Sequence, residues 1–145
     1  MLRQFPPPVP APSEDALFEA WTSQVGPRTR VLSIQHVFFS TGAIQPVQRL
    51  AAWARERGII TVVDGAHPPG MLAVDIQGLG CDFYASSPHK WLLAPIGTGF
   101  LYVRKAKIGG IWPMMAASAA MNDNIRKYEE IGTHPAANHN AIAEA

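Results

Sequence analysis

One lysine, Lys90, has the surroundings that a reactive amine needs. It follows a strand-like run at residues 81–86 and is followed by Trp91 and two leucines. An apolar setting lowers the cost of the neutral amine, so this lysine could act as a nucleophile that forms a Schiff base. The alternative is a surface lysine whose aliphatic stem lies along an apolar turn, which is the commoner situation for a lysine taken alone.

Polar residues flank this lysine on both sides. Ser87 and His89 alternate with Pro88, so both side chains can point at one ligand, although a histidine beside a tryptophan is often a packing residue. The small residues at 97–99, Gly-Thr-Gly, could place backbone N–H groups near an anion. The same three residues also make an ordinary turn into a strand.

An aspartate and a histidine follow a second strand-like run. Asp64 comes directly after residues 59–63, of which four are Ile or Val, and His67 lies three positions further on. A carboxylate at the end of a buried strand is costly unless a cation or several donors meet it. Asp-Gly is also a common turn dipeptide, so a turn or helix-capping role for Asp64 is the alternative.

The lysine and the aspartate together indicate more than either residue alone. A pyridoxal phosphate (PLP) site needs a lysine that forms a Schiff base with the aldehyde of the cofactor. It also needs a carboxylate that keeps the pyridine nitrogen protonated, so that the ring can accept carbanion electrons. Asp64 and Lys90 at the ends of neighbouring strands would meet both requirements.

The elements that would position these residues alternate along the chain. Ser13 is a predicted N-cap for a helix that ends before residue 26, and Pro46 opens a helix that Gly58 ends. Apolar and β-branched runs predict strands. These runs cover residues 31–39, 59–63, 81–86 and 99–104. Alternating strands and helices predict an α/β fold with a mainly parallel sheet, whose ligands bind past the carboxyl ends of the strands.

Composition excludes several classes of protein. The chain has 145 residues, of which 48% are apolar and 16% are charged, and its net charge is +1. It is too apolar for a disordered polyelectrolyte, and it has no strong positive field to attract nucleic acid or an anionic membrane. No run is long enough for a membrane span or a secretion signal, so a cytoplasmic protein without a nucleic-acid or membrane partner is expected. The low charge also indicates that part of the surface faces another domain or chain.

We divide the sequence into three parts. Residues 1–12 are a Pro-rich extended segment, residues 13–110 form the cofactor-binding part, and residues 111–145 form a linker and the start of a truncated helical segment. Residues 122–130 are expected to be helical, and a helix is expected to open at Pro135. The single cysteine, Cys81, excludes an internal disulfide and a cysteine-based zinc cluster, and no metal site is expected.

Residues 61–105 strongly resemble the class V aminotransferases of PLP fold type I. Three segments are most similar to the isopenicillin N epimerase-like branch of this family. They are D-G-A-H, D-F-Y and H-K-W-L-x-A-P-x-G-T-G-F-L-Y-V-R. The resemblance implies part of a three-layer α/β sandwich with a mainly parallel sheet and flanking helices, the PLP-binding large domain. It also implies PLP as the cofactor, an amino-acid or amino-acid-like substrate, and a homodimer.

The resemblance also implies a role for each matching residue. Lys90 would bind PLP as the Schiff base and later carry the proton at the substrate α-carbon, and Asp64 would pair with the pyridine nitrogen. His67, where the family has Gln or His, would hydrogen-bond the phenolic oxygen of the cofactor. Ser87 and His89 would contact the phosphate.

A further segment, Glu130-Ile131-Gly132-Thr133, resembles the E-x-G-T element of the family. Its threonine would reach the phosphate held by the other subunit of a dimer. A helix N-cap before Pro135 is the alternative role for Thr133, and the two roles are compatible.

The sequence departs from the family pattern at two points. Family members often have H-V-S-N-x-T-G where this chain has Phe39 in place of the polar residue that helps to hold the cofactor, and Ser40 is a candidate substitute. The loop with the catalytic cysteine of the desulfurases is absent, and Cys81 is expected in the core, which disfavours sulfur transfer.

The resemblance covers the middle of a family member of about 400 residues, so the leading interpretation is a segment of a PLP-dependent enzyme. Epimerisation, transamination or elimination at the α-carbon are all compatible with it. The alternative is a non-catalytic fragment that serves as a structural or dimer partner. A phosphate- or nucleotide-binding domain that uses residues 97–99 ranks lowest, because no G-x-G-x-x-G or Walker pattern stands between a strand and a helix.

Overall fold

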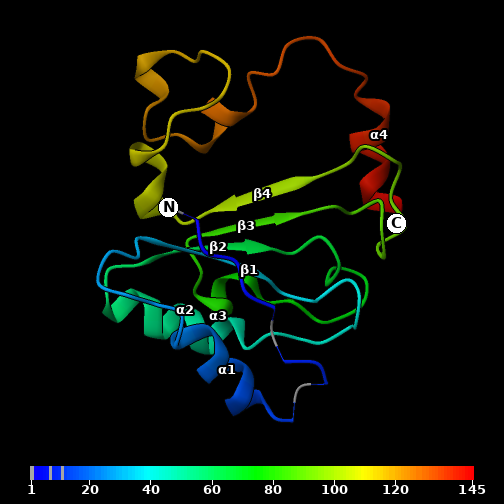
Figure 1. Ribbon diagram of the computed structural model, residues 1–145. Coiled ribbons are helices and arrows are strands. Elements are labelled where there is room, and N and C mark those ends of the chain that lie inside the picture. Colours follow the sequence, from blue (N-terminus) through cyan, green and yellow to red (C-terminus); the bar gives the residue numbers. More distant parts are fainter. Residues whose placement is uncertain (1, 7, 11) are drawn as a thin grey trace.

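A four-stranded mixed sheet forms the centre of the computed structural model, which describes residues 2–6, 8–10 and 12–145. The strand order is β1-β2-β3-β4, with the first two pairs parallel and the last pair antiparallel (Figure 1). The strands are β1 (Val31–Gln35), β2 (Ile60–Asp64), β3 (Phe83–Ser86) and β4 (Phe100–Val103). The predicted α/β class with a mainly parallel sheet is confirmed.

Helices cover one face of this sheet (Figure 1). They are α1 (Glu14–Thr22), α2 (Val47–Glu56) and the short α3 (Ile76–Leu79). The side chain of Ser13 accepts a hydrogen bond from the N–H of Ala16, which confirms the predicted N-cap of α1. Gly58, at a φ of 65°, follows the end of α2 as predicted.

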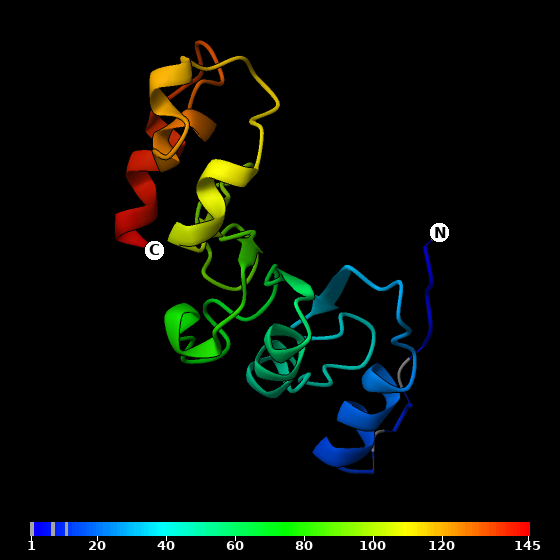
Figure 2. The same ribbon diagram turned by 90° about the vertical axis from the view of Figure 1, so that its left-hand side faces the viewer.

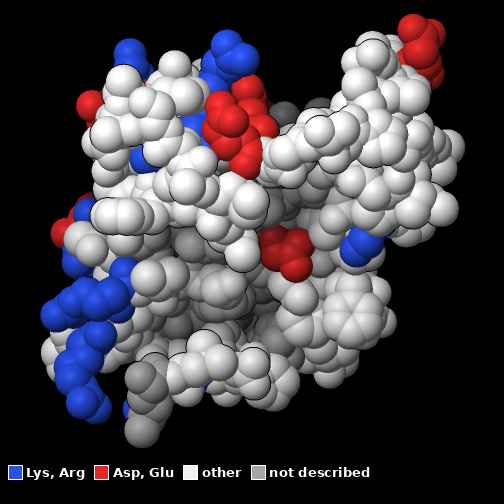
Figure 3. Space-filling model, turned by 90° about the horizontal axis from the view of Figure 1, so that it is seen from above, with Lys and Arg blue, Asp and Glu red and all other residues white. Residues whose placement is uncertain are grey.

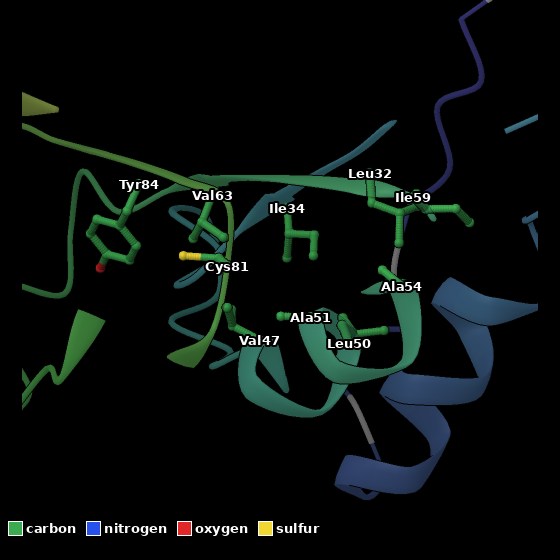
Figure 4. Packing of buried hydrophobic residues seen from close by; sticks show 10 residues of the cluster. All are labelled: Leu32, Ile34, Val47, Leu50, Ala51, Ala54, Ile59, Val63, Cys81 and Tyr84. Carbon is green, nitrogen blue, oxygen red and sulfur yellow. The ribbon is translucent and has the colours of Figure 1, made fainter. Parts of the chain in front are cut away.

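The core lies between α2 and the sheet. Alternate strand residues point toward the helix, whose buried residues recur at positions 47, 50, 51 and 54, as a helical face requires. Figure 4 shows these side chains facing one another across a single layer. The core residues it labels are Leu32, Ile34, Val47, Leu50, Ala51, Ala54, Ile59, Val63, Cys81 and Tyr84.

The chain after β4 forms short helical turns away from this core (Figure 2). They are η1 (Lys105–Gly110), η2 (Ala119–Met121), η3 (Ile125–Tyr128), α4 (Ala137–Asn140) and η4 (Ala141–Glu144). Lys127, 3% exposed, holds part of this segment, because its Nζ donates to the carbonyls of Ile108 (2.6 Å) and Asn122 (2.7 Å). Within residues 122–130, where a helix was expected, the structure has only the 3-10 turn η3. The helix expected to open at Pro135 begins at Ala137.

Two further element boundaries differ from the predictions. The strand expected at residues 31–39 ends at Gln35, because the chain turns back after Phe38 and Val37 bridges to Ile44. Cys81 is buried as expected but precedes β3. The described residues of segment 1–12 contain no helix or strand, and residues 1, 7 and 11 of that segment lie outside the described residues. The division into three parts stays a prediction.

Among the described residues, no helix combines the length and the apolar character that crossing a membrane requires.

Candidate functional site

The carboxyl ends of the three parallel strands lie side by side at one edge of the sheet. In the register of the ladder Gln35 pairs with Asp64, and Asp64 pairs with Ala85. The backbone continues this pairing, because the N–H of Gly65 donates to the carbonyl of Ala85 at 2.7 Å. Segments that are far apart in sequence therefore meet where ligands of parallel sheets usually bind.

Asp64 ends β2 with an exposed carboxylate. Its Oδ1 accepts a hydrogen bond from the N–H of Ala66 at 3.0 Å, which is the turn role considered as an alternative. This contact uses one of the two carboxylate oxygens, so a cationic N–H donor can still bind the other. The turn role and a ligand role are thus compatible.

His67 and Lys90 are brought together although 23 positions separate them in the sequence. Lys90 Nζ lies 3.4 Å from Nε2 of His67, and Nε1 of Trp91 donates to Nδ1 of the same ring at 3.0 Å. Lys90 is exposed and His67 half-buried, so the amine is open to a ligand while the imidazole is held by its neighbours.

A glycine makes the close contact between the two loops possible. Gly70 has a φ of 89°, and a Cβ atom placed on it would lie 2.4 Å from the backbone carbonyl carbon of Trp91. Any side chain here would push the loop after β2 away from the loop that carries Lys90. The distance between His67 and Lys90 thus depends on a position outside the predicted site residues.

Ser87 and His89 lie in the same loop as Lys90, and both are half-buried. The carbonyl of Ser87 accepts from the N–H of Lys90 at 3.0 Å, and Nδ1 of His89 lies 3.1 Å from the carbonyl of Thr98. A carbonyl only accepts, so Nδ1 of His89 carries the hydrogen and Nε2 is the nitrogen available to a ligand.

The Gly-Thr-Gly turn at residues 97–99 uses its own polar groups internally. Both the N–H (3.2 Å) and the hydroxyl (2.8 Å) of Thr98 donate to the carbonyl of Pro95. Thr98 is 2% exposed. These contacts weaken the nucleotide-binding interpretation and favour the ordinary turn.

A buried polar pair lies behind the site, and sequence reasoning missed it. Nδ1 of His36 lies 3.1 Å from the phenolic oxygen of Tyr84. Burial lowers the pKa of His36 and raises that of Tyr84, so both groups stay neutral near pH 7. Gly65 packs so closely on the Tyr84 ring that a Cβ would lie 2.0 Å from it. His36 directly follows β1, but a strand was expected over residues 31–39, so its position in the sequence gave no signal.

Two polar atoms at these strand ends have no hydrogen-bond partner among the described residues. They are Oγ of Ser86, a residue 7% exposed, and Oε1 of Gln35. Buried polar atoms without partners are uncommon and mark places where a ligand or water is expected. Ser86 is the last residue of β3 and Gln35 the last residue of β1, and these two strands lie on either side of β2, which Asp64 ends.

Thr133 is exposed, and it is not joined to this site by the hydrogen bonds of the described residues. It does not cap α4, whose N-cap is Ala136, so the capping alternative is wrong. Phe39 is 72% exposed and stacks on Phe38, and Ser40 is exposed beside it. In the described part of the chain, no group of three His, Cys, Asp or Glu residues could hold a metal ion.

Comparison with protein families places this arrangement in a known class. The family Aminotransferase class-V matches residues 12–141, so the chain belongs to this family. It is 49% identical over 114 residues to isopenicillin N epimerase of Amycolatopsis lactamdurans, which covers 78% of this chain and 29% of the relative. It is 39% identical over 90 residues to a probable cysteine desulfurase of Halalkalibacterium halodurans, which covers 62% of this chain and 22% of that relative.

Solved structures agree with this assignment. DndA of Streptomyces lividans superposes with a TM-score of 0.66 at 27% identity, covering 87% of this chain and 35% of that one. The cysteine desulfurase CsdA of Escherichia coli superposes with a TM-score of 0.60 at 31% identity, covering 72% of this chain and 25% of that one. The chain therefore spans about a third or less of the length of these relatives.

Proposed function

We propose that this chain carries the lysine-bearing part of a PLP site that acts at the α-carbon of an amino acid or amino-acid-like substrate. The observation that carries the proposal is the 3.4 Å contact between Lys90 Nζ and His67 Nε2, at the sheet edge where Asp64 ends its strand. Family membership supports the choice of cofactor.

The residues present fit this cofactor chemically. An exposed primary amine, an exposed carboxylate and a half-buried imidazole belong to adjacent strand ends, and Oγ of Ser86 has no partner among the described residues. When bound, PLP supplies an electron sink for the bond broken at the α-carbon.

Each residue then has a defined task. Lys90 binds the cofactor aldehyde through Nζ and moves a proton to or from the α-carbon. Asp64 holds a proton on the pyridine nitrogen, and His67 donates to the phenolic oxygen. Ser87 and His89 bind the phosphate, and Thr133 binds the phosphate of the other subunit in a homodimer.

Cys81 is not placed to act in sulfur transfer. Cys81 is fully buried in the core, and burial raises the pKa of its thiol, so it is not a reactive thiolate. A buried free cysteine also agrees with a reducing compartment, and we infer a cytoplasmic location.

Borohydride trapping tests the proposal directly. The purified chain is incubated with PLP and reduced, and the labelled lysine is located by mass spectrometry of peptides. We expect substoichiometric labelling, since the chain spans a minor part of its relatives, with the label concentrated on Lys90 and lost in Lys90→Ala. Lys105→Ala, which removes another exposed lysine, is the matched control and keeps the label.

Three outcomes would overturn the proposal. They are a label spread evenly over all lysines, undiminished labelling of Lys90→Ala, and no labelling of Lys90 in the unaltered chain. Each result would favour the alternative of a non-catalytic structural protein.

A further inference from the structure

The hydrogen bonds on the His67 ring define which of its nitrogens carries the proton. Nε1 of Trp91, 3.0 Å away, can only donate, so Nδ1 of His67 must offer a lone pair. A neutral imidazole has one N–H and one lone pair. The hydrogen of neutral His67 is therefore on Nε2.

That hydrogen faces the reactive lysine. Nε2 lies 3.4 Å from Nζ of Lys90, and an N–H in this position needs an acceptor. An ammonium group has three donors and no acceptor, whereas a neutral amine has a lone pair. Only the neutral amine, which is the nucleophilic form, can accept a hydrogen bond from this N–H.

We propose that Trp91 is a positioning residue that holds His67 in the Nε2–H tautomer and so aims one N–H donor at Lys90 Nζ. The inference rests on the proposed function for its consequence. In PLP the phenolic oxygen is on the ring carbon next to the one that bears the aldehyde. A donor aimed at the nitrogen that reacts with this aldehyde is therefore also aimed at the neighbouring oxygen.

The setting of Trp91 favours this role over simple packing. The side chain is 54% exposed, so core burial does not account for its position. Its backbone is fixed instead by the close approach of Gly70, and its indole N–H spans the gap to the loop after β2. A phenylalanine here would keep an aromatic ring but lose the N–H that the imidazole needs.

Nitrogen NMR of the cofactor-free chain tests the tautomer. The chain is labelled with ¹⁵N-histidine, and long-range ¹H–¹⁵N correlations are recorded about 2 pH units above the ordinary imidazole value, where histidine is generally neutral. The His67 signals are assigned by their loss in His67→Asn. We expect Nδ1 and Nε2 of His67 to show the limiting shifts of an unprotonated and a protonated nitrogen.

Trp91→Phe should move these two shifts toward each other, because the second tautomer becomes populated. Trp112→Phe is the matched control: Trp112 is 93% exposed, and its change should leave the His67 shifts as they are. If Trp91→Phe fails to fold, benzothienylalanine at position 91 replaces only the N–H by sulfur and keeps the ring shape. A proton on Nδ1 in the unaltered chain, or unchanged shifts in the folded variants, would overturn the inference.

Labelling by PLP and borohydride separates this inference from the proposed function. We expect the rate of Lys90 labelling to fall about fivefold in Trp91→Phe, the effect of roughly one lost hydrogen bond. Absence of Lys90 labelling in the unaltered chain would refute the proposed function and leave the tautomer result standing. Specific Lys90 labelling combined with the wrong tautomer would refute the inference alone.

Discussion

The burial of His36 makes folding stability depend on pH. Burial lowers the pKa of this histidine in the folded chain, so the unfolded chain binds more protons wherever the two states differ. Stability therefore falls as the pH falls through about 6.5, and this group contributes no change above about pH 7.5. The largest slope from one such proton is about 1.4 kcal/mol per pH unit.

We expect His36→Asn to flatten this slope between about pH 7.5 and 5.5, a range above most carboxylate titration. The variant should also be less stable by about 1–3 kcal/mol at neutral pH, because the smaller amide leaves part of the buried volume of the imidazole unfilled. Urea unfolding at a series of pH values measures both effects. His134→Asn changes an exposed histidine and should keep the original slope. An unchanged slope in His36→Asn would show that another group is responsible.

At the residue scale, positions next to strand ends could be predicted and side-chain partners could not. Asp64 and Lys90 stood out because a charge beside a β-branched or apolar run needs an explanation. The hydrogen bond from Trp91 to His67 depends on how two loops pack against each other, and no sequence periodicity predicts this packing. The roles of Ser87, His89 and Thr133 toward a phosphate stay predictions.

At the scale of elements, the site is formed by the loop after β2 and the loop after β3, which can approach closely because Gly70 has no side chain. Gly70 and Gly97 have the same φ of 89°, but only Gly70 has backbone atoms within 3 Å of the place where a Cβ would be. Both Ala variants suffer the strain of a positive φ, which is of order 1 kcal/mol. Gly70→Ala adds the displacement of the Trp91 backbone.

We therefore expect Gly70→Ala to lower the free energy of unfolding by about 1–3 kcal/mol more than Gly97→Ala does. Urea unfolding of the two variants measures this difference, and Gly97→Ala serves as the control for backbone strain. Equal losses in the two variants would show that the close approach of the loops contributes nothing to stability.

Elements with a strong periodicity of apolar residues could be predicted from the sequence, and elements without one could not. The face of α2 repeats at positions 47, 50, 51 and 54 and was visible in the sequence. The strand at residue 31 was predicted too long, because residues 36–39 are equally apolar and the reversal after Phe38 is a tertiary feature. Residues 122–130 have only Ile125 and Tyr128 as large apolar residues, and the buried Lys127 amine organises their turns.

At the scale of the whole molecule, the apolar surplus in the composition is found on the surface. In Figure 3 most of the face seen from above is uncharged, with Lys and Arg mainly along one border and Asp and Glu in a few small groups. Trp112 and Met114, in the segment after η1, are 93% and 103% exposed. Soluble monomers rarely expose large continuous apolar patches, and such surfaces usually bind another protein surface.

We expect the isolated chain to self-associate through this segment. Replacing Trp112 and Met114 together by serine removes two large exposed side chains, and no core packing is lost because both are exposed. The weight-average mass in sedimentation velocity should rise with concentration in the unaltered chain and rise severalfold less in the double variant. Leu2→Ser removes another exposed apolar side chain, 80% exposed at the other end of the chain, and should leave the association unchanged. Association that persists unchanged in the double variant would show that this segment does not mediate it and would direct attention to other surfaces, such as the edge strands β1 and β4.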